Sequence, residues 1–386
     1  MPGPHYSPKE LLARLVAFDT TSHRSNLALV AFVEDYLLQH GVISVRLPST
    51  DGVKASLFAT IGPGDKRGVA LSGHTDVVPV DGQAWATDPF TLHAGDGRLY
   101  GRGTSDMKGY LACVLASVPG FKRRHLTTPI HIAFSYDEEI GCLGVRPMIA
   151  EFAKTLPKPR LVFVGEPTSM QVVDAHKGPV RWQVDITGRA AHSSMAHLGV
   201  NAIQFATRLT GELDRIAAEL KISSRDDRFD PPFATLQVTR FEGGTAANIV
   251  PVSCWFGFEV RALPGVDIDG IERRLRTFAE THCLAEMRAI APEASISITR
   301  GNSVPPFAAD MSSEVVALAL KLTGQNETHT VSYATEAGLF QDAGSPAIVC
   351  GPGDIAQAHT ANEWIAESEL AKCMGFLARL GDWAEA

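Results

Sequence analysis

A histidine and two aspartates stand at a spacing that suits a metal ion. His74 and Asp76 follow an apolar run, residues 68–73, which is typical of a buried strand. Side chains two residues apart on an extended chain point the same way. Asp106 follows later, between a glycine-rich turn and a helix-like run. Imidazole and carboxylate ligands suit zinc, although a histidine beside an aspartate is more often an ordinary surface or core pair.

Three further apolar runs end close to acids or to a histidine. Residues 129–135 lead into Glu138 and Glu139, residues 160–164 lead into Glu166, and residues 347–350 precede His359. Turns are polar, so for any single strand the acids need no other explanation. Together, however, these strands predict a site at the carboxyl ends of an open α/β sheet, where such sheets bind their ligands.

The composition is that of an ordinary globular protein, with 386 residues, 45% of them apolar, and a net charge of -8. No basic cluster exceeds residues 122–124, so we expect neither nucleic-acid binding nor polybasic attachment to a membrane. No apolar stretch has the length of a membrane span, and the N-terminus lacks the features of a signal peptide. The 6 cysteines form no C-x-x-C pair. We therefore expect reduced thiols in a cytoplasmic protein.

The elements that must position the site follow an α/β pattern. Strands alternate with helices, among them helices expected at 108–118, before Pro119, and at 143–156. This alternation predicts a mixed, largely parallel sheet flanked by helices on both faces. Residues 180–300 instead read β-α-β-β-α-β, the order of a small ferredoxin-like α+β domain. We therefore expect a discontinuous catalytic domain, 1–179 and 301–386, with an inserted lid or dimerisation domain, 180–300.

The motifs as a set resemble the M20 family of dinuclear-zinc amidohydrolases and exopeptidases. The matching blocks occur in the family order and run nearly end to end: GHTDVVPVDG, WATDPF, LYGRGTSDMKG, SYDEEIGCLG, VGEPT, AHKG, HSS…LGVNAI and GPGDIAQAHTANEWI. A set of this length is far more specific than a single short motif.

The resemblance implies a role for each residue of the strand ends. One zinc is expected on His74 and Glu166, the other on Glu139 and His359, with Asp106 bridging them. Asp76 is expected to orient His74. Glu138 is expected to act as the general base that takes a proton from water, which leaves a hydroxide held between the zinc ions. Cobalt or manganese are possible substitutes for zinc. The family also has a cis peptide bond after the bridging aspartate, here Asp106-Met107.

Four further residues match positions that bind substrate in the family. His192 is expected to stabilise the oxyanion, apparently in the active site of the partner subunit of a homodimer; a loop or capping histidine is the alternative. Asn248 and Arg261 are expected to contact substrate, but either residue fits an ordinary turn or a strand-end salt bridge. Glu336 is expected to pair with a substrate ammonium group.

The resemblance implies hydrolysis of an N-acyl amino acid, a small-molecule substrate. The block around Glu336 favours N2-acetyl-L-ornithine, cleaved to L-ornithine and acetate in arginine biosynthesis. The alternatives are desuccinylation of succinyl-diaminopimelate, deacetylation of acetylcitrulline and general aminoacylase activity. A peptidase of the family more often has aspartate where this chain has Glu166. A non-catalytic member predicts gaps among the ligands, and the sequence shows none.

Overall fold

The computed structural model describes residues 3–386, which divide into two compact units. The first unit comprises the chain up to Asp174 with Ala308–His329 and Thr335–Ala386. The second unit comprises Ala175–Phe307 with Thr330–Ala334. This division differs by a few residues from the expected boundaries of the insert 180–300, and those boundaries stay a prediction.

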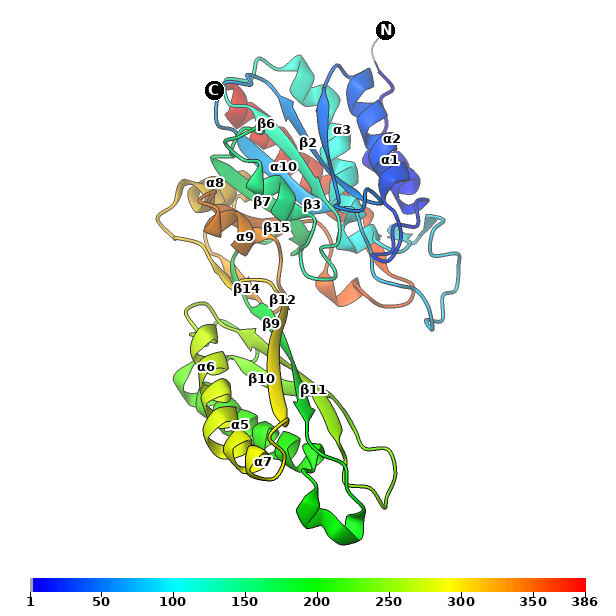
Figure 1. The fold of residues 1–386 in the computed structure, drawn as a ribbon. Helices are drawn as coiled ribbons and strands as arrows, with labels where there is room; N and C mark the ends of the chain where they lie inside the picture. The colour runs from blue at the N-terminus through cyan, green and yellow to red at the C-terminus, as the bar shows by residue number, and fades with distance from the viewer. Residues whose placement is uncertain (1–2) are drawn as a thin grey trace. The chain divides into compact units, whose positions relative to one another are not determined.

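A nine-stranded mixed sheet organises the first unit, and three of its strands also include residues that the division assigns to the second unit (Figure 1). Its strands are β1 (Ser44–Pro48), β2 (Ala55–Ile61), β3 (Val69–His74), β6 (Ile130–Ser135), β7 (Leu161–Pro167), β8 (Val173–His176), β13 (Phe307–Ala308), β14 (His329–Val331) and β15 (Ala347–Gly351). Their order is β1-β2-β6-β3-β7-β15-β8-β13, with β14 beside β8. Neighbours among β6, β3, β7 and β15 run parallel, and β1, β2 and β8 pair antiparallel.

The four parallel strands are buried along their whole length, as their continuous apolar runs predict. Helices cover both faces of the sheet. One face carries α1 (Pro8–Val16), α2 (Leu27–Gln39), α3 (Gly109–Arg123), α8 (Glu314–Thr323) and α10 (Glu367–Glu385), which share one hydrophobic core. The other face carries α4 (Val145–Ala150) and α9 (Ala337–Asp342). A small sheet joins β4 (His93–Gly95), β5 (Arg98–Tyr100) and β16 (Trp364–Ala366).

Two expected helices differ from the observed ones. The helix predicted at 143–156 is only α4, because the chain leaves the helix after Ala150 and turns at Ala153, whose φ is +62°. The helix expected to stop before Pro119 continues to Arg123 as α3, with the proline inside it.

The second unit has the expected ferredoxin-like order. It contains β9 (Gly178–Thr187), α5 (Ala202–Ser223), β10 (Thr235–Gly243), β11 (Ser253–Ala262), α6 (Ile268–Ala279), α7 (Ala285–Ile290) and β12 (Ser295–Ser303). The strands form an antiparallel sheet in the order β10-β11-β9-β12. Inward-facing side chains of β9 and β11 alternate with exposed ones, and Trp182 stacks on Phe258 with ring centroids 4.8 Å apart. The fold class predicted from the sequence is confirmed.

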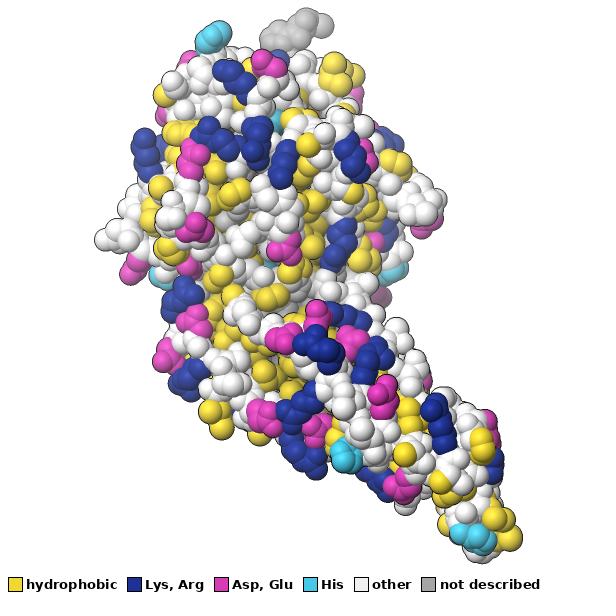
Figure 2. Space-filling model, turned by 60° about the vertical axis from the view of Figure 1, so that its left-hand side comes forward, with side chains coloured by type: hydrophobic (Ala, Val, Ile, Leu, Met, Phe, Trp, Pro, Cys, Tyr) yellow, Lys and Arg dark blue, Asp and Glu magenta, His cyan; other side chains and the backbone are white. Residues whose placement is uncertain are grey.

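The surface charges and the cysteines can be described briefly. On the face drawn in Figure 2, basic and acidic side chains are interspersed. Within residues 3–386, no helix is both long and apolar enough to cross a membrane. All six cysteines are buried free thiols.

Candidate metal centre

The four parallel strands bring the predicted ligands to one edge of the sheet. His74 is the last residue of β3, and Glu166 is the residue before the last in β7. Glu139 follows β6, and His359 follows β15. Because these strands are parallel neighbours, their carboxyl ends lie side by side, and all four side chains reach the same region.

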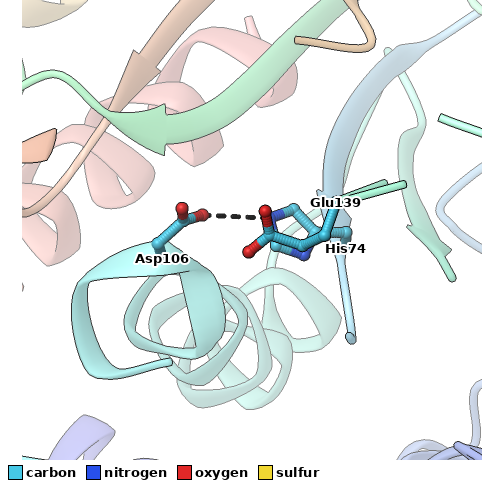
Figure 3. Close-up of side chains that lie close together, drawn as sticks. All are labelled: His74, Asp106 and Glu139. Carbon is cyan, nitrogen blue, oxygen red and sulfur yellow. Dashed lines mark hydrogen bonds and ion pairs between the residues drawn. The ribbon is translucent and has the colours of Figure 1, made fainter. Parts of the chain in front are cut away.

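Asp106 lies between the two histidines. Its Oδ1 is 3.0 Å from Nε2 of His74, and its Oδ2 is 3.2 Å from Nε2 of His359. Nε2 of His359 is also 3.0 Å from Oε2 of Glu139, while Nε2 of His74 is 3.8 Å from Oε1 of Glu166. The close-up shows Asp106 reaching toward His74 and Glu139 (Figure 3). Each oxygen of Asp106 therefore faces a different histidine, the arrangement that a bridging ligand needs.

Asp76 fixes the other side of the His74 ring. Nδ1 of His74 lies 2.9 Å from the backbone carbonyl of Asp76 and 3.5 Å from its Oδ1. The Asp76 carboxylate also accepts hydrogen bonds from the Ser22 hydroxyl and from the backbone N–H groups of Glu138 and Glu139. Asp76 thus orients the imidazole and holds the turn that presents both glutamates.

Burial and crowding of like charges raise the proton affinity of the acids. Burial, together with the neighbouring Asp106, raises the pKa of Glu139 to about 7 and that of Glu166 well above its usual value. Hydrogen bonds to Asp106 and Glu139 raise the pKa of His359 to about 10. Burial alone would lower the pKa of His74, but its hydrogen bonds to Asp106 and Asp76 outweigh burial and raise it. These raised pKa values show that the clustered carboxylates favour a positive charge beside them, whether a proton or a cation.

This donor set fits divalent cations. Ligand atoms of His74, Asp106 and Glu139 lie within 4.8 Å of one another, and so do those of His74, Glu138 and Glu166. Imidazole nitrogens combined with carboxylate oxygens are typical ligands of zinc and of similar borderline metals. Both adjacent glutamates reach the cluster, so one can bind a cation while the other remains free to carry a proton.

Glycines allow the ligand-bearing strands to pack this closely. A Cβ on Gly73, the residue before His74, would lie 2.7 Å from Cε of Met107. A Cβ on Gly165, the residue before Glu166, would lie 2.2 Å from the ring of Tyr110. Two of the ligands are therefore each preceded by a glycine because the segment after Asp106 packs against the backbone there. The Asp106-Met107 peptide bond is cis, as the resemblance implied.

Glu336 is buried between two strands of the large sheet. It is 1% exposed, and its carboxylate accepts hydrogen bonds from the hydroxyls of Ser72 in β3, at 3.0 Å, and of Ser135 in β6. Burial raises its pKa to about 6, against the effect of the Ser135 hydrogen bond. Each carboxylate oxygen thus accepts one serine hydroxyl, and the expected pairing with a substrate ammonium group stays a prediction.

The other expected substrate residues belong to the second unit. His192 is exposed, and its Nδ1 accepts a hydrogen bond from the backbone N–H of Ser194. Asn248 is exposed, and its backbone carbonyl accepts a hydrogen bond from the N–H of Ser193. Nε of Arg261 is 2.6 Å from Oε1 of Glu259. Because these residues lie in the other unit, their roles at the metal ligands stay a prediction.

Sequence reasoning missed two buried residues beside Asp106. Arg102 and Glu363 are each 1% exposed and form an ion pair of 2.8 Å. Glu363 also accepts the backbone N–H of Asp106. Both residues lie inside motif blocks, LYGRGTSDMKG and AHTANEWI, whose other members drew the functional assignments. The available signal was a further charged residue in each of two motif blocks that also contain a predicted metal ligand.

Comparisons with known proteins agree with this geometry. Residues 70–382 match the model of Peptidase family M20/M25/M40. A protein named acetylornithine deacetylase from Myxococcus xanthus is 35% identical over 373 residues, 95% of each chain. One of the same name from Proteus mirabilis is 36% identical over 351 residues, 90% of this chain and 88% of the relative.

Solved structures share the fold at lower identity. A metallo-carboxypeptidase of the M20 family from Sulfolobus solfataricus superposes with a TM-score of 0.75 at 20% identity, covering 97% of this chain and 98% of that chain. The YXEP protein of Bacillus subtilis, described as a dinuclear metal binding peptidase, has a TM-score of 0.68 at 15% identity and covers 97% of each chain. The chain therefore belongs to peptidase family M20/M25/M40, and it is a metal-dependent hydrolase that acts on amides.

Proposed function

We propose that this enzyme hydrolyses the amide bond of an N-acyl amino acid, with N2-acetyl-L-ornithine as its substrate. The products are L-ornithine and acetate, and the reaction is a step of arginine biosynthesis in the cytoplasm. The observation that carries the proposal is the identity of 35% with an acetylornithine deacetylase over 95% of both chains. The cluster around Asp106 supports it, because hydrolysis of an unactivated amide needs a strong electrophile.

The proposed cofactor is a pair of zinc ions, for which cobalt or manganese can substitute. His74 and Glu166 would hold one ion, Glu139 and His359 the other, and Asp106 both. When bound, the ions supply positive charge that polarises the substrate carbonyl and lowers the pKa of water toward neutrality.

Glu138 is the proposed general base. Its backbone N–H donates to Oδ1 of Asp76 at 3.1 Å, and its Oε1 accepts from the thiol of Cys142 at 3.3 Å. One contact thus holds the backbone of Glu138 and the other its carboxylate, which lies beside His74 and Glu166. From this position Glu138 takes a proton from the attacking water and passes it to the leaving amine.

Two residues of the second unit are suited to the remaining tasks. Arg261 shares the Glu259 carboxylate with Arg181, whose Nε is 2.7 Å from it. One acid beside two guanidinium groups leaves a net positive charge, which suits the carboxylate of an amino-acid substrate. Because Nδ1 of His192 accepts a backbone N–H, its neutral imidazole carries the proton on Nε2 and can donate to an oxyanion. Asn248 is a further proposed substrate contact, since its backbone carbonyl accepts the N–H of Ser193, the residue after His192.

We also propose that the enzyme is a homodimer. The segments around His192 expose several apolar side chains, among them Met195 at 47%, Leu198 at 49% and Ile249 at 41%. Exposed apolar residues of this kind are typical of surfaces that contact another protein.

A steady-state rate panel on zinc-loaded protein tests the substrate. N2-acetyl-L-ornithine, N-acetylcitrulline, N-succinyl-diaminopimelate and N-acetylmethionine are compared, with Glu138→Gln as the matched control. We expect the highest kcat/KM on acetylornithine and a loss of at least about 100-fold in the variant, as for removal of a general base. Chelation should abolish activity, and added zinc should restore it.

Each of the other outcomes would contradict a different part of the proposal. A preference for another compound of the panel contradicts the proposed substrate and leaves the metal chemistry intact. Full activity in Glu138→Gln contradicts the assignment of the base. A zinc-loaded protein that is inactive on all four compounds overturns the proposed function.

A further inference from the structure

Glu363 lies buried beneath the turn that carries Asp106, and its carboxylate accepts four hydrogen bonds. Its Oε2 accepts from Nη1 of Arg102 at 2.8 Å and from the N–H of Gly103 at 2.9 Å. Its Oε1 accepts from the N–H groups of Ser105 at 2.9 Å and of Asp106 at 3.1 Å. A carboxylate held by so many donors has a fixed orientation. Glu363 therefore fixes the backbone from which the Asp106 side chain extends.

Arg102 continues the hydrogen bonding away from Glu363. Its Nη2 donates to Oε1 of Gln83 at 2.5 Å, and its guanidinium lies 5.2 Å from the centre of the Trp85 ring. Nε1 of Trp85 donates to the same amide oxygen at 3.1 Å. Because both donors point at the same atom of the Gln83 amide, that atom must be the oxygen. The amide nitrogen therefore lies on the opposite side, away from Arg102 and Trp85.

Gln83 in turn holds the turn that presents His359. Its Nε2 donates to the backbone carbonyl of His359 at 2.9 Å, and the N–H of Ala86 donates to Oδ1 of Asn362 at 2.7 Å. His359 and Asn362 have φ values of +61° and +58°. Residues other than glycine adopt this left-handed conformation rarely, and surrounding contacts must maintain it. The segment around Gln83 supplies two of those contacts.

We propose that Gln83, Arg102 and Glu363 form one positioning network that sets the separation of Asp106 and His359. The inference rests on the proposed function, in which these two residues bind the same zinc ion. None of the three network residues touches the ion in this scheme. The network instead holds the backbone of Asp106 on one side of the ion and the backbone of His359 on the other. Loss of the network should therefore lower the affinity for that ion. Groups that orient metal ligands typically change metal affinity by about 10–100-fold.

Zinc titration without substrate tests the network. Chelator-stripped wild type, Gln83→Ala and Glu363→Gln are titrated with zinc against a chromophoric chelator, and their thermal unfolding midpoints are measured without metal. Glu367→Gln is the matched control, since this exposed glutamate near Glu363 pairs with Lys9, at 2.8 Å, and lies outside the network. We expect two zinc ions in wild type and control. Gln83→Ala should lower the affinity for one ion, the one proposed to bind Glu139 and His359, by about 10–100-fold and leave the affinity for the other unchanged.

Glu363→Gln should weaken both ions, because Asp106 contacts both. In the wild type, four donors share the two carboxylate oxygens of Glu363. A glutamine has only one acceptor oxygen, so some of these hydrogen bonds are lost and part of the turn is released. Wild-type affinities in both variants, with the metal-free midpoints unchanged, would overturn the inference. Should Glu363→Gln fail to fold, Gln83→Ala alone decides the question, since its side chain lies nearer the surface. Inactivity toward acetylornithine does not enter this readout, whereas a wild type that binds no zinc overturns both proposals.

Discussion

Glu336 is buried between hydroxyl groups of the two strands that lead to the metal centre. Ser72 lies two residues before His74, and Ser135 accepts, through its backbone carbonyl, the hydroxyl of Thr75 at 2.7 Å. By accepting from both serines, Glu336 ties the ends of β3 and β6 together. At the scale of the residue, this geometry favours a positioning role toward His74, which would affect every substrate alike, over the expected pairing with a substrate ammonium group.

The Glu336→Gln variant distinguishes positioning from recognition. We expect kcat/KM to fall by the same factor, about 10-fold, for acetylornithine and for acetylmethionine, because the amide replaces one acceptor oxygen beneath His74. Ser72→Ala, which removes one of the two hydrogen bonds, should show the same pattern to a smaller degree. A rise of KM confined to acetylornithine would instead mean that Glu336 binds the substrate ammonium group.

At the scale of the element, β6 contains a histidine that has no part in the proposed chemistry. His131 is 0% exposed; its Nδ1 lies 3.0 Å from the hydroxyl of Thr60 in β2, and its Nε2 accepts the N–H of Gly68 at 3.2 Å. Burial lowers its pKa from 6.5 to about 4. The folded protein therefore keeps His131 neutral in a pH range in which the unfolded chain binds a proton.

This difference predicts an acid-sensitive sheet. Because the folded pKa is depressed, stability is lost as pH falls from 6.5 to about 4, by about 3 kcal/mol in total, and His131 adds no further loss below that. In His131→Gln this part of the pH dependence should disappear. Denaturant unfolding of metal-free wild type and variant between pH 4 and 8 measures it. Parallel stability curves for the two proteins would contradict the prediction.

The strands and most ligands could be predicted because their signals are local. A continuous apolar run that ends at a histidine or an acid is visible within ten residues of sequence, as at β3 and β7. The end of α3 was not visible, since Pro119 normally stops a helix. In the structure α3 nevertheless continues through Pro119 to Arg123, and the Ser117 hydroxyl donates to the carbonyl of Cys113 at 2.9 Å.

Residues whose partners are distant in sequence could not be predicted. Glu363 contacts the N–H of Asp106 across 257 positions of sequence, and no local pattern shows that this acid folds back beneath it. The same holds for Glu336, which is 264 positions from Ser72. The sequence marks it as an acid in a motif block, but only the tertiary fold shows that its carboxylate accepts hydrogen bonds from serines of two strands.

At the scale of the whole molecule, the proposed chemistry is divided between two compact units. The first unit contains every proposed metal ligand and Glu138, whereas His192 and Arg261 belong to the second. In a homodimer, the second unit of one chain can complete the site of its own chain or that of the partner. These alternatives differ in how two defective chains complement each other.

We expect complementation between a Glu138→Gln chain and a His192→Ala chain. If His192 acts in the partner's site, a mixed dimer combines the intact Glu138 of one chain with the intact His192 of the other in one of its two sites. Mixed dimers isolated by two affinity tags should then have about half the wild-type rate, while each variant alone is nearly inactive. As a control, a chain with both substitutions paired with wild type should show no complete site, because each site then lacks one of the two residues. An inactive complementing pair, together with half activity in the control, would mean that His192 serves the site of its own chain.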